Sequence, residues 1–360
     1  MDKTSEQFKA LVAYASNDLG AGKLFKNLAE KDEGFVYDDL LDARKTSFLD
    51  LDLVGARVSG VPRELPQGHS EKVLNMCLDR LVEKEAFVSL IRDKDSSGGD
   101  IMQAYALLFD RKPIITVCEK DNYVDHPWIQ FHSSEISNSF NEFGSSFREH
   151  VRSSHGEIDK RRDWMRSFLD LPVKEIGLNP QLYFAHASTH RDDVLTLQYG
   201  IGFESVGQLT LINPYSDLQG SDKDNELEDR RAAGEKVNLS LDQSIDIVHR
   251  DVGSIVECDG ILVYLNESPI TIGREQELVY GMLAGKQAMY GICTDKRLAE
   301  HPLIRAHLDH VLYYDPKTPL SEIAEDATPK ILKFINDQRA AGFNKRVETY
   351  RQNIRERLVG

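Results

Sequence analysis

The sequence is poor in cysteine, has no long apolar run, and has too few basic residues to balance its acidic ones. Its four cysteines are widely spaced without a CxxC pair, which argues against a zinc site and a disulfide framework. No stretch approaches the roughly 18 apolar residues of a membrane-spanning helix, and the N-terminus lacks a signal-peptide pattern. Lys and Arg number 44 against 59 Asp and Glu, a net charge of −15, whereas nucleic-acid-binding proteins cluster basic residues. We therefore expect a reduced, cytoplasmic protein that binds neither a membrane nor a nucleic-acid polymer.

The composition is typical of a folded protein with a small-molecule partner. At 360 residues the chain is long enough for about two domains. It is 41% hydrophobic and 29% charged, which excludes a disordered or fibrous protein.

An internal repeat is the main pattern along the chain. Five residues recur at an offset of 175, namely Gly98, Tyr105, Cys118, His126 and His132 as Gly273, Tyr280, Cys293, His301 and His307. The first apolar runs, 11–17 and 183–189, are offset by 172. These offsets predict a first unit at about 1–143 and a second at about 178–321. A charged helical linker at 144–177 joins them, and helices follow at 322–360.

Each unit alternates short apolar runs with amphipathic segments. In the second unit, β-type runs at 261–265 and 288–293 enclose a helical segment at 275–283, which ends at Gly285. This βαβ order predicts an α/β protein with two tandem, doubly wound, mostly parallel sheets, similar to flavodoxin or Rossmann folds and arranged as an internal pseudo-dimer. The very polar segment 217–236 is expected to be a surface loop, and a lid is one interpretation of it.

Acidic residues of the second unit fall near strand ends, where ligands bind in open α/β sheets. Asp259 precedes an apolar strand, Asp251 lies on the helix before it, and Glu277 lies on the helix that opens after Gly273. A carboxylate in the first turn of a helix tends to stay ionised and nucleophilic. Tyr183, on the first strand of this unit, completes the candidate set.

In order and spacing these residues resemble the nucleoside 2-deoxyribosyltransferase family. The resemblance covers about 130 residues of the second unit and rests on Tyr183, Asp251, Asp259 and the segment 273–281, GREQELVYG. It implies a transferase or N-glycosidase of nucleotide metabolism that exchanges or releases the base of a 2-deoxynucleoside or deoxynucleotide, without metal or cofactor. Homo-oligomers are also implied, since family members complete their pockets with a neighbouring subunit.

The resemblance also implies a role for each residue. Glu277 corresponds to the nucleophile that attacks C1′ of the sugar, Asp251 to the acid that assists protonation of the leaving base, and Tyr183 to the phenol that positions both. Asp259 corresponds to an acid that supports the pocket. A covalent intermediate on one carboxylate, with a second acidic group for the proton, is also the arrangement of retaining glycosidases.

Three further positions are expected to contact the substrate, and two of them depart from the family pattern. Gly273 opens the helix. Thr271 stands where the family commonly has an acid that holds the 5′ side of the sugar. Arg274 replaces a small hydroxyl residue, and either binds a 5′-phosphate or forms a surface ion pair.

The first unit is expected to be a degenerate copy. It has Met102 at the position of Glu277, Val12 or a neighbour at that of Tyr183, and Lys84 at that of Asp259. A thioether cannot act as the nucleophile, so this unit is predicted to keep the fold and to supply a wall of the other unit's pocket.

Other interpretations stay open for the whole chain and for its histidines. The chain is alternatively a non-catalytic nucleotide-binding or sensing protein, or an enzyme of the NAD-glycohydrolase type. No GxGxxG motif supports dinucleotide binding. The group of His301, His307, His310 and Asp309 is expected to be structural, because a spacing of six does not place two imidazoles on one helical face.

Overall fold

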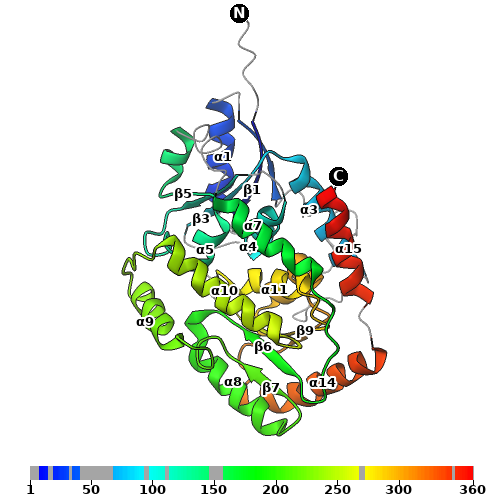
Figure 1. The fold of residues 1–360 in the computed structure, drawn as a ribbon. Coiled ribbons are helices and arrows are strands. Elements are labelled where there is room, and N and C mark those ends of the chain that lie inside the picture. Colours follow the sequence, from blue (N-terminus) through cyan, green and yellow to red (C-terminus); the bar gives the residue numbers. More distant parts are fainter. Residues whose placement is uncertain are drawn as a thin grey trace, which may run out of the picture.

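The computed structural model describes most of the chain in detail (Figure 1). The described residues are 8–14, 19–31, 35–40, 68–92, 97–109, 113–145, 157–266, 272–342 and 345–359. Within these ranges no helix is both long enough and apolar enough to cross a membrane.

The elements follow the same order in the two units. The first unit contains β1 (Phe8–Tyr14), α1 (Leu19–Lys31), β2 (Phe35–Asp39), α3 (His69–Glu83), β3 (Ala86–Ile91), α4 (Ser97–Leu108), β4 (Ile114–Cys118), α5 (Pro127–His132) and β5 (Glu135–Ser137). The linker contains α7 (Glu157–Ser167) and η2 (Phe168–Asp170). The second unit contains β6 (Gln181–Ala185), η3 (Ser188–His190), α8 (Arg191–Glu204), β7 (Thr210–Ile212), α9 (Ser221–Ala232), α10 (Leu241–Glu257), β8 (Gly260–Leu265), α11 (Arg274–Leu283), β9 (Ala288–Cys293), α12 (Lys296–Ala299), α13 (Pro302–His307) and β10 (His310–Tyr313). The chain closes with α14 (Leu320–Ala341) and α15 (Lys345–Val359).

Two parallel sheets confirm the predicted fold class. The described strands form two five-stranded sheets, in the orders β2-β1-β3-β4-β5 and β7-β6-β8-β9-β10, and every pair is parallel. The central strands β3, β4, β8 and β9 are buried along their whole length, as expected where helices cover both faces of a sheet. Both units are therefore doubly wound and Rossmann-like.

Strand alternation decides which side chains face the centre of the molecule. On β6, Tyr183 and Ala185 belong to the core cluster that contains residues of α10 and α11, whereas Leu182 and Phe184 pack with α8 and α14. Successive side chains of a strand point to opposite faces, so Tyr183 points toward α11. The central cluster contains residues of both units, and the two units therefore share one core.

The units pack about a pseudo-twofold axis between α4 and α11. These two helices contact each other, α5 packs on α10, and its equivalent α13 packs on α3. In Figure 1 the two sheets lie on opposite sides of the central helices, and α15 returns from the second unit to lie beside α3.

Symmetry-related hydrogen bonds join the units across this axis. Nε2 of His132 bonds to the Tyr280 hydroxyl over 2.9 Å, and Nε2 of His307 bonds to the Tyr105 hydroxyl over 2.5 Å. Both histidines and both tyrosines recur at the offset of 175, so the same bond forms twice with the roles of the units exchanged.

Candidate active site

A hydrogen bond between Tyr183 and Glu277 lies at the centre of the candidate site. Tyr183 is on β6, and Glu277 is in the first turn of α11, the helix that follows β8. The Tyr183 hydroxyl donates to Oε1 of Glu277 over 2.7 Å, and both side chains are buried. Burial raises the pKa of Glu277 well above its usual range, the charge of Asp251 raises it further, and the tyrosine hydrogen bond opposes the shift. Glu277 therefore holds a proton more readily than a solvated glutamate.

Asp251 is the second buried acid of the site. It lies on α10, whose N-terminus is fixed by a capping box of Ser240 and Gln243. Nε and Nη2 of Arg250 donate to Oδ1 of Asp251 over 3.0 and 2.6 Å, while Nη1 of Arg250 pairs with Asp224 at 2.5 Å. Burial raises the pKa of Asp251 to about 6, and Arg250 opposes the shift. The site thus holds two acids with raised pKa values, and the charge of Asp251 contributes to the shift of Glu277.

A small cavity beside Asp251 has walls from both units. His126, Pro127 and Trp128 of the first unit line it, together with residues of the second unit that include Tyr215 and Asp251. Its volume is about 30 Å³, enough for a water molecule or two but not for a nucleoside. Residues of the first unit thus line this partly open cavity, whereas Tyr183 and Glu277 do not line it, and a nucleoside fits only if the cavity widens.

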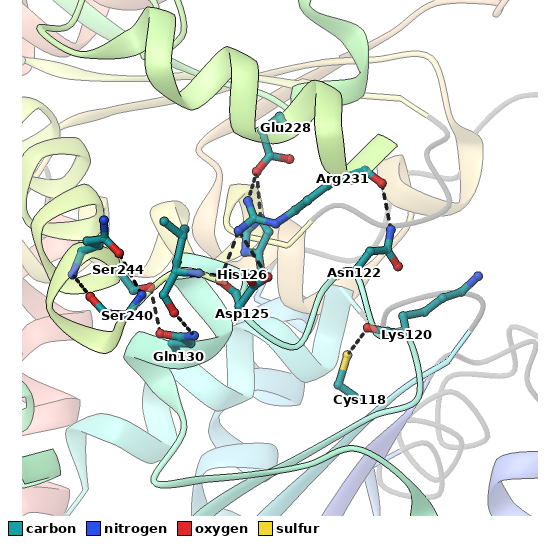
Figure 2. A network of polar contacts seen from close by, with 12 residues as sticks. Cys118, Lys120, Asn122, Asp125, His126, Gln130, Glu228, Arg231, Ser240 and Ser244 are labelled. Atoms are coloured by element: carbon teal, nitrogen blue, oxygen red, sulfur yellow. Dashed lines mark hydrogen bonds and ion pairs between the residues drawn. The ribbon is translucent and has the colours of Figure 1, made fainter. Parts of the chain in front are cut away.

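Helix α9 covers the cavity and is attached to the first unit. Figure 2 shows Arg231 of α9 reaching toward Glu228, His126 and Asp125. The buried Arg231 guanidinium pairs with Glu228 at 2.5 Å and with Asp125 at 3.5 Å, and Asn122 donates to the Arg231 carbonyl oxygen over 2.9 Å. The expectation of a loop over the whole segment 217–236 was wrong, because residues 221–232 are helical.

Position 273 requires a glycine, both for its backbone conformation and for a close contact with the first unit. Its φ is +106°, which favours glycine, and a Cβ at this position would lie 2.9 Å from Cδ1 of Trp128. The indole ring of the first unit therefore packs directly on the start of α11. Thr271, the other position expected to contact the sugar, lies outside the described residues.

Arg274 is buried and not part of the cavity wall. Its Nη2 and Nε bond to Oε1 of the equally buried Glu275 over 2.5 and 3.2 Å. Arg274 was expected either to bind a 5′-phosphate or to form an ion pair at the surface. The structure shows an ion pair, and this pair is buried inside the protein. A charged arginine with a carboxylate partner has less to gain from a phosphate.

Asp259 is not brought together with the other acids. It precedes β8, so it lies at the amino ends of the strands, whereas the connections to α11 leave from the carboxyl ends. Its carboxylate accepts from the Gln181 N–H over 2.9 Å and pairs with Lys174 at 3.2 Å. We correct the expectation that Asp259 supports the pocket, because it fixes the start of β6.

The first unit repeats this structural contact. Glu85 precedes β3 and accepts from the Lys9 N–H at the start of β1 over 3.0 Å. The strand pairing thus makes Glu85 the counterpart of Asp259, in place of the expected Lys84. An acid kept in both units at the amino end of the sheet serves the fold.

Apolar side chains occupy the first-unit positions that correspond to Tyr183, Asp251 and Glu277. Strand pairing places Leu11 at the tyrosine position, next to the expected Val12. When the buried residues of α3 are aligned with those of α10, Cys77 corresponds to Asp251. Met102 of α4 corresponds to Glu277 of α11. All three are fully buried in the shared core. At these described positions the first unit therefore has no counterpart of the carboxylate pair.

The histidines considered above as a group are separated by their contacts. His301 accepts from the Ile304 N–H at the start of α13, and His307 bonds to Tyr105. Asp309 pairs with Arg346, and His310 packs against Tyr290.

Several residues of the site were not predicted from the sequence. Arg250 follows no recognisable motif, and its importance comes from contact with Asp251 and Asp224. His126 and Trp128 reach the cavity from the other unit, although the HPWIQFH repeat that contains them was visible.

No protein-family model matches this sequence, and no curated protein matches it at a significant level. We therefore base the functional proposal on the geometry of Tyr183, Asp251 and Glu277.

Proposed function

We propose that the second unit catalyses N-glycosyl transfer or hydrolysis on a 2-deoxynucleoside or deoxynucleotide, as in nucleoside 2-deoxyribosyltransferases. The observation that carries the proposal is the buried Tyr183–Glu277 hydrogen bond beside a second buried acid, Asp251. A carboxylate positioned by a phenol suits attack on a sugar carbon, and a neighbouring carboxyl suits transfer of a proton to a leaving base.

The reaction proceeds through two displacements at C1′. An Oε atom of Glu277 bonds to C1′ as the C1′–N bond breaks, and Asp251 gives its proton to the departing base. A nitrogen of a second base, or a water oxygen, then attacks C1′ and releases Glu277, while Asp251 takes back a proton. Two inversions give net retention. Both acids have raised pKa values, and the reaction requires the proton on Asp251 and the charge on Glu277, which the hydrogen bond from Tyr183 favours.

A substrate without phosphate is favoured by the charges around the site. Arg250 and Arg231 on the cavity wall each pair with carboxylates, and Arg274 pairs with Glu275. A phosphate group would have to displace one of these internal partners. A deoxynucleoside has no phosphate that competes for these arginines.

Base exchange tests the proposal directly. The full chain is incubated with a deoxynucleoside and a second free base, and the products are separated by chromatography. A 2-fluoro-sugar analogue should leave a covalent adduct on the peptide that contains Glu277, because fluorine slows the second displacement. Glu277→Gln should form no adduct and release no base. The matched control is Asp259→Asn, which changes an equally buried acid at the opposite end of the sheet and should keep both activities.

Two results would contradict the proposal. One is an adduct that forms equally in Glu277→Gln. The other is the absence of base exchange, base release and adduct in the unmodified protein, which would favour the non-catalytic nucleotide-binding alternative.

A further inference from the structure

The helix that carries Glu277 is held by the first unit at three points. Trp128 packs on Gly273 at the start of α11. Gln276, the residue before Glu277, donates to Oε1 of Gln103 over 3.1 Å. Tyr280, nearly one turn after Glu277, bonds to His132. The contacts thus lie before, beside and after the proposed nucleophile.

The donor and the acceptor in the hydrogen bond between His132 and Tyr280 can be assigned. Nδ1 of His132 lies 2.8 Å from the carbonyl oxygen of Trp128, which accepts only from an N–H, so Nδ1 carries the proton. Nε2 is therefore the acceptor for the Tyr280 hydroxyl. The imidazole also stacks on the Trp128 ring, with centroids 5.7 Å apart and an interplanar angle of 7°. Both His132 and Tyr280 are fully buried, so the hydroxyl has no water to replace this acceptor.

The pseudo-twofold axis supplies an internal control for this contact. Tyr105 and His307 form the equivalent bond, but the helix that they hold is α4, which carries Met102 in place of the glutamate. Tyr105 also bonds to Tyr350 over 2.7 Å. Removal of the Tyr105 hydroxyl therefore disturbs at least as many hydrogen bonds as removal of the Tyr280 hydroxyl.

We propose that the first unit, through Trp128 and above all His132, positions the nucleophile of the second unit. The inference rests on the proposed function of Glu277 and extends it by assigning a catalytic contribution to the unit that lacks reactive acids. His132 is a positioning residue, since it contacts Tyr280 and not the cavity. A displacement of about 1 Å at a reacting group can lower a rate about 100-fold, so a small rotation of α11 is sufficient for a measurable effect.

Tyr280→Phe compared with Tyr105→Phe separates positioning from general stability. We expect Tyr280→Phe to lower kcat about ten-fold and the rate of adduct formation with the 2-fluoro-sugar analogue by the same factor, with KM changed less than about two-fold. Tyr105→Phe should keep both rates. His132→Ala should behave like Tyr280→Phe, whereas His132→Gln, whose amide oxygen can still accept, should recover part of kcat. Equal falls in kcat for Tyr280→Phe and Tyr105→Phe would overturn the inference.

Hydrogen exchange provides a readout that does not depend on turnover. Tyr280→Phe should raise amide exchange in residues 274–283 and leave 97–108 protected, and Tyr105→Phe should do the reverse. If the unmodified protein shows no base release, the proposed function fails, and the exchange pattern still decides whether the first unit holds α11. Equal exchange of both helices in both variants would overturn the inference on its own.

Discussion

Replacement of Asp251 by asparagine should change the pH dependence of stability in a defined direction. Asp251 is 6% exposed, and burial raises its pKa from 3.8 to about 6. The unfolded chain therefore releases this proton near pH 4, whereas the native protein keeps it until about pH 6. Within this window only the native state binds the proton, so stability falls as pH rises. A raised carboxyl pKa thus gives the opposite sign to that of an ordinary ion-paired aspartate.

The size of the effect follows from the pKa difference. Each pKa unit corresponds to about 1.4 kcal/mol, so a shift of about two units corresponds to about 3 kcal/mol. The substituted asparagine has no proton to release, and its amide oxygen can still accept from Arg250, which also keeps Asp224. The stability of Asp251→Asn relative to the unmodified protein should therefore grow by about 3 kcal/mol between about pH 3.5 and pH 7.5.

Urea unfolding followed by tryptophan fluorescence at a series of pH values measures this difference. Asp259→Asn is the matched control, because Asp259 is also 6% exposed but pairs with Lys174. Loss of that pair should destabilise the control at neutral pH. The reasoning is refuted if the relative stability of Asp251→Asn is flat with pH or falls as pH rises.

Two further predictions concern the first unit and the sheet. Met102→Ala should destabilise the protein by about 2–5 kcal/mol in urea unfolding, because the substitution opens a cavity in the shared core. Its turnover should be retained. If the folded variant lost turnover as completely as Glu277→Ala, the passive role of position 102 would be contradicted. Gly260→Ala should lower the thermal unfolding temperature, because the new Cβ would overlap the carbonyl oxygen of Ala288. The Cβ of Gly253→Ala, on α10, would meet open space, so this variant should be more stable by about 0.5–1 kcal/mol. Similar shifts in the two glycine variants would count against the packing of β8 on β9.

Periodicity and the repeat were sufficient to predict the fold class. A helix after each apolar run implies parallel strands, and the offset of 175 implies two equivalent units. Tyr183, Asp251 and Glu277 were grouped by their positions near strand ends and by the family resemblance, and the structure joins Tyr183 and Glu277 by a hydrogen bond. Their roles in a reaction stay predictions.

Contacts between the units could not be predicted in the same way. The sequence shows that HPWIQFH and HPLIRAH are related, but not that α5 packs on α10 of the other unit and carries Trp128 to Gly273. Asp259 was misplaced for a simpler reason. An acid before a strand lies at its amino end, away from the loops that lead to the α11 helix.

The hydrogen bonds of Tyr105 have a consequence for biosynthesis. Its two partners, His307 and Tyr350, follow it by 202 and 245 residues. At a translation rate of about 5–20 residues per second, the second partner emerges roughly 10–50 s after Tyr105 itself. The face of α4 that will meet α11 lacks this partner on the nascent chain until residues 274–283 emerge. A ribosome that stalls within the linker therefore leaves an apolar surface open to aggregation or to a chaperone.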